Sequence, residues 1–317
     1  MDNNGKMKKG IIESLIVISI MVMYAVYGIH FLPSLMIFIP LPFIILGIRN
    51  HIYNNIFSII IASLIIQLLL GSSYGASLVL LFAPLSVAIN YCIKHKKKSM
   101  ETILISTAVF ILSFLLIISL GERVSDFNFT AQIEDFLSQS INMQIEIFKE
   151  LGVSNDDLAR LSESLEDQNR TIMVRIPSLL IIISFLISYI NIFFSSFVLR
   201  KMGYGYVPEQ RFSRFRLPNN IIPGIGIMFL AAFIMKSLEV QYHGALLLNL
   251  TFLVSFIFIV QGLAVIDFLL IRLKMKSVFR FLILALNIFI LPTSTILFFI
   301  GVIDSIFDLR KLRMQKS

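Results

Sequence analysis

The longest polar stretch of the chain, residues 121–177, reads GERVSDFNFTAQIEDFLSQSINMQIEIFKELGVSNDDLARLSESLEDQNRTIMVRIP. Apolar segments flank it on both sides, and runs of about 18 or more apolar residues indicate transmembrane helices. The chain is 57% hydrophobic and only 15% charged, so it has more apolar surface than a soluble domain could bury. The sequence therefore predicts an all-α, polytopic transmembrane helix bundle that this polar stretch divides into two halves.

The net charge of +8 is distributed unevenly along the chain. The polar stretch carries 11 acidic and 5 basic side chains, whereas the remaining residues carry 22 basic and 8 acidic ones. These basic residues lie in short loops between apolar runs, as the positive-inside rule expects of cytoplasmic loops. The pattern predicts that the polar stretch lies outside and both termini lie in the cytoplasm. It also argues against a nucleic-acid partner, because no separate basic domain is present.

Three regions are expected. Residues 1–120 form a first membrane half with five spans, and residues 121–175 form an acidic extracytoplasmic helical hairpin. Residues 176–317 form a second membrane half of four or five spans, with a basic cytoplasmic loop and tail. Pro292 interrupts the last apolar stretch, residues 279–307. Two short helices there would keep the basic tail inside and give about ten membrane segments, and one broken span is the alternative.

The polar stretch itself shows helical periodicity. Its apolar residues follow the spacing of one helix face: Ile133, Phe136, Leu137, Ile141, Ile145, Phe148 and Leu151. Gly152 is expected to end this helix, and Ser154 is expected to cap a second one. Pro177 is then expected in the first turn of the sixth span. The hairpin would lie on the outer membrane surface or cover the outer mouth of the bundle, and a solvated connector is the alternative.

Several motifs resemble known families. The run IPLPFIILGIRNHIYNNIFSIIIASLIIQLLLG, residues 39–71, resembles the early helices of substrate-specific components of energy-coupling-factor vitamin transporters. The segments ELGVSNDDLARL, RFSRFRLP and GVIDSIFDLRKL, beginning at Glu150, Arg211 and Gly301, resemble the YybS-like family of bacterial membrane proteins. These resemblances imply a multi-pass protein of the bacterial plasma membrane. They also imply a relation to transporter substrate components, although the YybS-like family has no settled activity.

The function expected from these features is small-molecule binding or transport. The alternative is a non-catalytic membrane scaffold or interaction protein that acts in envelope processes. None of the four histidines has a carboxylate or cysteine at metal-ligand or catalytic-triad spacing, and no phosphate-binding Gly-x-x-x-x-Gly-Lys-Ser/Thr motif occurs. We therefore expect no enzymatic activity, no cofactor and no metal site. Transport would need a partner ATPase, an ion gradient or facilitated diffusion.

Polar residues within membrane segments are candidates for substrate binding, because they are costly there. Those expected near the outer side are Gln67, Tyr74, Asn287 and, in an outer loop, Glu239 and His243. The alternative role for the uncharged side chains is to hydrogen-bond neighbouring helices together.

A second group of candidates is expected on the cytoplasmic side, for coupling or for docking a partner. It comprises Arg211, Arg214 and Arg216 in an aromatic-rich loop, and Asp304, Asp308 and Arg310 near the carboxyl terminus. The arginines would alternatively bind lipid phosphates. The two aspartates are expected on one helical face, paired with Arg272 or Arg280, and the alternative to coupling is a simple clamp on helix ends. Asp267 and Arg272 are expected to form another helix-end ion pair.

Overall fold

The computed structural model describes residues 3–124, 128–204, 207, 211–289 and 291–311, and these form helices and connecting turns with no strand among them. Six described helices are long and apolar enough to cross a membrane, judged by length and composition, and four further apolar helices are shorter. The all-helical class is thereby confirmed. The count of about ten membrane segments and the cytoplasmic location of both termini stay predictions.

The chain divides into two compact units. Unit 1 comprises Met1–Gln132 and Ile183–Gln210, and unit 2 comprises Ile133–Ile182 and Arg211–Ser317. The helix α8 (Asn155–Lys201) begins in unit 2 and ends in unit 1. The three regions expected from the sequence stay a prediction.

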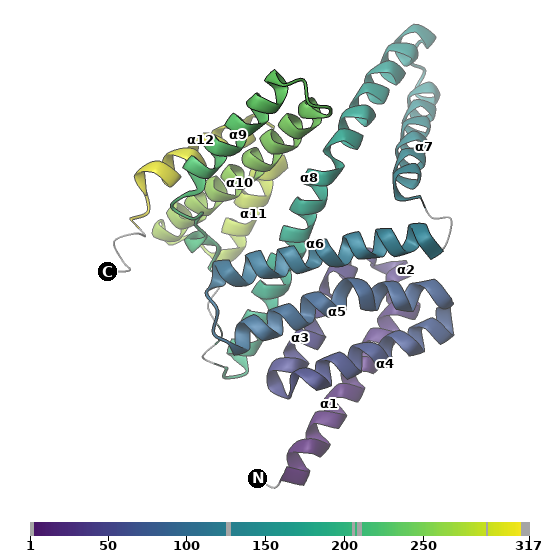
Figure 1. The fold of residues 1–317 in the computed structure, drawn as a ribbon, viewed down its shortest axis with the longest axis vertical. Helices are drawn as coiled ribbons and strands as arrows, with labels where there is room; N and C mark the ends of the chain where they lie inside the picture. Colours follow the sequence, from purple (N-terminus) through teal and green to yellow (C-terminus); the bar gives the residue numbers. More distant parts are fainter. Residues whose placement is uncertain (1–2, 125–127, 205–206, 208–210, 290, 312–317) are drawn as a thin grey trace. The chain divides into compact units, whose positions relative to one another are not determined.

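Unit 1 contains the first six α-helices (Figure 1). The chain runs through α1 (Asn3–Met23), the π-helical turn η1 (Tyr24–Gly28), α2 (Ile29–Phe31), the 3₁₀ helix η2 (Pro33–Phe38), α3 (Pro40–Arg49), α4 (Ile52–Leu70), α5 (Ser72–Lys94) and α6 (Ser99–Val124). Helix α4 packs against α1, α3 and α5, and α5 packs against α6. The fully buried side chains of Ile44, Leu85 and Ile89 lie in the core of this unit.

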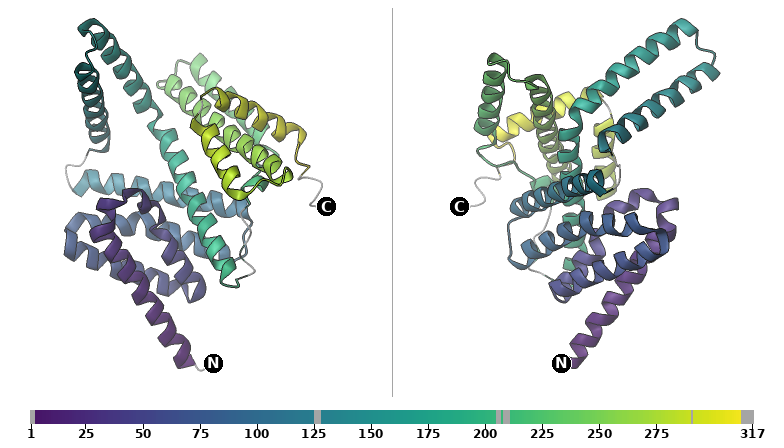
Figure 2. Two further views of the ribbon diagram at one scale, coloured as in Figure 1. Left: turned by 180° about the vertical axis from the view of Figure 1, so that it is seen from behind. Right: turned by 45° about the vertical axis from the view of Figure 1, so that its right-hand side comes forward.

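Helix α7 (Phe129–Glu150) and the first part of α8 form a helical hairpin (Figure 2). Gly152 ends α7 in the left-handed region, with φ of +80°, and the Val153 N–H donates to the Phe148 carbonyl. The Ser154 hydroxyl oxygen accepts the Asp157 N–H at 3.3 Å and so caps α8. The two helices of the polar stretch and their shared turn are therefore confirmed, whereas their extracytoplasmic location stays a prediction.

The prediction that Pro177 begins a new helix is wrong, because α8 continues through it. Proline lacks an N–H and displaces the neighbouring backbone groups from their helical partners. Asn249 of α10 (His243–Arg272) supplies substitutes: its amide oxygen accepts the Ser178 N–H at 3.0 Å, and its amide nitrogen donates to the Val174 carbonyl at 2.8 Å. One side chain of another helix thus lets α8 remain a single helix of 47 residues.

Unit 2 also contains η3 (Phe212–Arg214), α9 (Ile221–Ser237), α11 (Ser277–Phe289) and α12 (Leu291–Phe307). Helix α10 packs against both α9 and α12. Gly262 faces the Leu297 carbonyl and Gly301 faces the Phe258 carbonyl, so that a β-carbon at either glycine would overlap the opposing backbone. The backbones of α10 and α12 therefore approach closely at these two glycines.

The last apolar stretch consists of two helices, α11 and α12, with Ile290 between them outside the described residues. Helix α11 packs against both α10 and α12. The separation of this stretch into α11 and α12 agrees with the expected two short helices.

Candidate functional site

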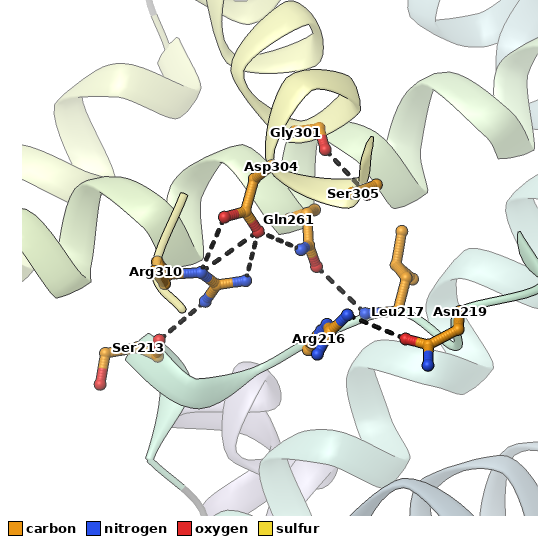
Figure 3. A network of polar contacts seen from close by, with 9 residues as sticks. All are labelled: Ser213, Arg216, Leu217, Asn219, Gln261, Gly301, Asp304, Ser305 and Arg310. Atoms are coloured by element: carbon orange, nitrogen blue, oxygen red, sulfur yellow. Dashed lines mark hydrogen bonds and ion pairs between the residues drawn. The ribbon is translucent and has the colours of Figure 1, made fainter. Parts of the chain in front are cut away.

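A fully buried ion pair occupies the interior of unit 2. Asp304 lies on α12 and Arg310 lies just beyond it, and the side chain of each is only 1% exposed. The Arg310 Nη2 donates to Asp304 Oδ2 at 2.8 Å, and its Nε donates to the same oxygen at 3.2 Å (Figure 3). A charged pair at this depth is costly to desolvate and needs further hydrogen bonds around it.

Two other elements supply those hydrogen bonds. Gln261 of α10 donates from Nε2 to Asp304 Oδ2 at 2.5 Å, and its Oε1 accepts the Leu217 N–H at 3.2 Å. The Arg310 Nη1 donates to the Ser213 carbonyl at 2.7 Å. We call these five residues, Asp304, Arg310, Gln261, Ser213 and Leu217, the Asp304–Arg310 network. It joins α10, α12, the chain that follows α12 and the loop 211–220.

The local backbone explains why these groups meet. Helix α12 ends at Phe307, and Asp308 adopts a left-handed conformation with φ of +49°, which turns the chain back on itself. This turn brings Arg310 to Asp304 although the two are six residues apart. In the loop, the single turn of η3 presents the Ser213 carbonyl, and the buried side chains of Phe215 and Leu217 anchor the loop in the unit.

The expected shared helical face of Asp304 and Asp308, and the pairing expected for Asp304, are wrong. Asp304 and Asp308 do not share a helical face, because Asp308 lies beyond the end of α12 in the left-handed region. Asp304 binds Arg310 rather than Arg272 or Arg280. Arg280 of α11 instead binds Asp267 of α10, with Nη2 to Oδ1 at 2.7 Å, so the expected pair of Asp267 with Arg272 is also wrong. In both cases the partner is set by a turn after the helix, which periodicity alone does not reveal.

The loop arginines differ in their surroundings. Arg211 and Arg214 are exposed, whereas Arg216 is half-buried and donates to Asn219 Oδ1 at 2.8 Å. Their loop therefore contacts the Asp304–Arg310 network through the backbone of Ser213 and Leu217. The same loop carries the exposed Arg211 and Arg214. The roles of these arginines in coupling or docking stay predictions.

Sequence reasoning missed Gln261, which connects α10 to the loop and to Asp304. The available signal was its position as a lone amide in an otherwise apolar part of α10. The two backbone groups of the network, the Ser213 carbonyl and the Leu217 N–H, leave no signal in the sequence.

The structure places the candidate substrate-binding residues on separate elements. Gln67 is half-buried on α4 of unit 1, and the side chain of Tyr74 lies outside the described part of the structure. Glu239 is exposed in the turn before α10 of unit 2, and His243 is the first residue of α10, with Nδ1 3.0 Å from the Val240 carbonyl.

Asn287 of α11, also in unit 2, donates to the Ile283 carbonyl of its own helix at 2.8 Å. Its backbone carbonyl accepts the Thr293 hydroxyl at 2.7 Å, which links α11 to α12. This contact fits the helix-tying role that was the alternative for the uncharged candidates. The role of all five candidate residues in substrate binding stays a prediction.

The fold thus defines a membrane protein with several apolar helices. Residues 16–305 match the family described as "Predicted membrane protein (DUF2232)", and the chain belongs to that family. No curated protein and no solved structure matches the chain.

Proposed function

We propose that the protein binds a small molecule within its membrane helices and transports it, in the manner of the substrate-specific components that its first half resembles. The observation that carries this proposal is the Asp304–Arg310 network. Ionisable groups inside membrane segments are costly and commonly mark substrate pathways or coupling elements. Here the two charges lie within an apolar unit and are 1% exposed.

The connections of the network suit a coupling element. A displacement of the loop 211–220 would break the contacts from Leu217 to Gln261 and from Ser213 to Arg310, and would thereby act on α10 and on the carboxyl-terminal segment. Packed interfaces of this kind switch between discrete arrangements rather than deform continuously. In this proposal, a partner ATPase on the cytoplasmic side docks at the exposed Arg211 and Arg214.

Other features of the proposal come from the sequence. The protein would lie in the bacterial plasma membrane as a YybS-like protein, with about ten membrane segments and both termini in the cytoplasm. The substrate would enter from the outer side, and Gln67, Tyr74, Glu239, His243 and Asn287 would contact it. The protein would have no enzymatic activity of its own.

A metabolite screen tests substrate binding. The purified protein in lipid nanodiscs would be screened by thermal shift against vitamins and other small metabolites, and the dissociation constant of each hit would be measured by calorimetry. We expect at least one stabilising compound, and an affinity loss of about tenfold for Glu239→Gln or Gln67→Leu, which corresponds to one lost polar contact. Glu146→Gln on the exposed surface of α7 is the matched control. A screen without any stabilising compound would contradict the proposal.

A second candidate function is a non-catalytic scaffold, and the exposed face of α7 favours it. Four large apolar side chains lie along one stripe of this helix and its end and are 51–73% exposed: Phe136, Met143, Ile147 and Leu151. Exposed apolar stripes of this kind occur at sites of protein interaction.

Cross-linking in native membranes distinguishes the two functions. If α7 docks a partner, Phe136→Ser combined with Leu151→Ser should abolish a specific cross-linked product, while metabolite binding stays unchanged. If α7 instead covers a substrate, the same variant should weaken metabolite binding, and the pattern of cross-links should stay as in the wild type.

A further inference from the structure

A cluster of uncharged polar side chains is buried in the apolar core of unit 1. Asn55 of α4 and Ser86 and Asn90 of α5 are each 0% exposed, and we call these three residues the amide cluster. Gly47 of α3 lies directly against the Asn90 amide, where a β-carbon would come within 2.7 Å of Nδ2. The cluster is therefore enclosed by three helices.

The hydrogen bonds within the cluster leave polar atoms without partners. The Asn90 Nδ2 donates to the Ser86 carbonyl at 2.9 Å, which fixes the orientation of this amide, because a carbonyl can only accept. The Asn90 Oδ1 then has no partner among the described residues, and neither does one end of the Asn55 amide. Burying such a group without a hydrogen bond is energetically unfavourable.

Counting protons identifies which end of Asn55 is left over. The Ser86 hydroxyl has one proton and lies 3.0 Å from the Ala83 carbonyl but 3.3 Å from the Asn55 amide oxygen. If the proton goes to the nearer carbonyl, Asn55 is best oriented with its Nδ2 donating to the Ser86 hydroxyl oxygen, since the two ends of an amide are assigned from the hydrogen-bond network. The Asn55 Oδ1 is then the group without a donor.

A third oxygen lies at the same level of the bundle. Ser106 of α6 is 0% exposed, and its hydroxyl also has no partner among the described residues. Helices α5 and α6 pack with Phe82 beside Phe110 and Cys92 beside Thr102. These two pairs show that the helices are antiparallel, and interpolation between them places Ser106 at the level of Ser86.

We propose that the amide cluster and Ser106 form a binding site for a sodium ion, with Asn55 Oδ1, Asn90 Oδ1 and the Ser106 hydroxyl as ligands. Oxygen ligands without charge suit a hard monovalent cation, whereas Ca²⁺ sites are built around carboxylates. The described residues contain no group of three or more His, Cys, Asp or Glu side chains that could hold a metal ion. A sodium gradient could then drive the proposed transport, but the site itself does not depend on that transport.

Cation-dependent thermal unfolding tests this site. Cys92 is the single cysteine and is 0% exposed, so a thiol-reactive fluorescent dye reports unfolding of unit 1. Unfolding would be followed in NaCl, KCl and choline chloride at equal ionic strength, with no other ligand. We expect a saturable increase in Tm that is specific to Na⁺, of about 5 °C at 100 times the dissociation constant.

Substitutions localise the effect. Asn90→Ala and Asn55→Ala should abolish the Na⁺-specific increase in Tm, and Ser106→Ala should weaken Na⁺ binding at least about tenfold. Asn55→Asp keeps an oxygen ligand and adds a negative charge, so it should bind Na⁺ more tightly. The matched control is Asn191→Ala, because Asn191 is also 0% exposed in unit 1 and its Oδ1 also has no partner among the described residues, but it is not part of the amide cluster: its Nδ2 donates to the carbonyls of Ile37 and Ile187.

Direct binding of ²²Na⁺ to the wild-type protein in nanodiscs covers the case in which the alanine variants do not fold. Saturable binding that excess NaCl displaces and KCl does not would support the site. If neither the Tm nor ²²Na⁺ binding shows a Na⁺-specific effect, a water molecule that donates to both amide oxygens occupies the cluster, and the proposal is wrong. Equal loss of the Tm increase in Asn191→Ala would overturn the assigned location.

Discussion

The two buried polar regions of this protein differ in how completely their hydrogen bonds are satisfied. In unit 2, every side-chain nitrogen and oxygen of Asp304, Gln261 and Arg310 has a partner, and none of them is among the described buried atoms without one. In unit 1, Asn55, Asn90 and Ser106 each leave an atom unpartnered. Of the eight such atoms in the described residues, seven belong to unit 1.

This difference suggests two kinds of role. A satisfied network stabilises one arrangement of the elements it joins, because every alternative arrangement leaves a charge unpaired. A cluster with unpartnered oxygens retains the capacity to bind, because a bound ion or molecule would remove the cost of those oxygens. In our proposals, unit 2 therefore contains the coupling element and unit 1 contains the sodium site.

The largest effect is expected from breaking the Asp304–Arg310 network. Arg310→Ala leaves Asp304 buried without its countercharge, which should lower the free energy of unfolding by about 3–5 kcal/mol. Circular dichroism during a titration from mild detergent into SDS measures this change. Adding Asp304→Asn to the variant should recover part of the loss, since a neutral amide is cheaper to bury than a charge. Arg214→Ala, at an exposed position of the loop 211–220, should change the stability by less than about 0.5 kcal/mol.

The contact between α10 and α12 at Gly262 and Gly301 should be the next most sensitive point. Gly301→Ala places a β-carbon against the Phe258 carbonyl and forces α10 and α12 apart, which should cost about 1–3 kcal/mol. The same titration measures it. Gly226→Ala is the control, because that position of α9 has open space around it, and there alanine should be neutral or slightly stabilising. Equal effects of the two substitutions would show that close contact between α10 and α12 is not required.

A somewhat smaller effect is expected at the proline in α8. Asn249→Leu leaves the Ser178 N–H and the Val174 carbonyl without their partner, at a cost of about 1–2 kcal/mol. In a Pro177→Ala background the helix can form its normal backbone hydrogen bonds, so the same substitution should cost much less. A double-mutant cycle measures this coupling. Additive effects of the two substitutions would mean that Asn249 does not stabilise the helix at the proline.

The smallest effect is expected at Ser106, the proposed third ligand beside the amide cluster, when sodium is absent. Ser106→Ala removes a buried hydroxyl that has no partner among the described residues. In choline chloride the free energy of unfolding should therefore stay within about 0.5 kcal/mol of the wild type or increase. Thermal unfolding with the thiol dye measures it. A loss as large as that of Arg310→Ala would show that Ser106 is part of a satisfied network, and the contrast between the two units would then disappear.

Part of the fold could be predicted from the sequence because it depends on neighbouring residues. The limits of the hairpin helices follow from Gly152, which tolerates positive φ, and from Ser154, which caps the next helix through its own side chain. The role of Pro177 could not be predicted in this way, because the neighbouring Ser178 N–H and Val174 carbonyl are bound by Asn249, which lies 71 and 75 residues further along the chain.

The sequence by itself determined that this is a membrane protein of apolar helices with one amphipathic hairpin, because hydropathy and helical periodicity are properties of contiguous residues. Only the tertiary structure decided which polar groups meet. Asp304 pairs with Arg310 because of the left-handed turn at Asp308, and Gln261 and Ser213 complete the pair from distant segments. Asn55 and Asn90 likewise meet at Ser86 only because α4 packs against α5. Hydrogen-bond partners are chosen by packing, and packing brings together residues that no local pattern connects.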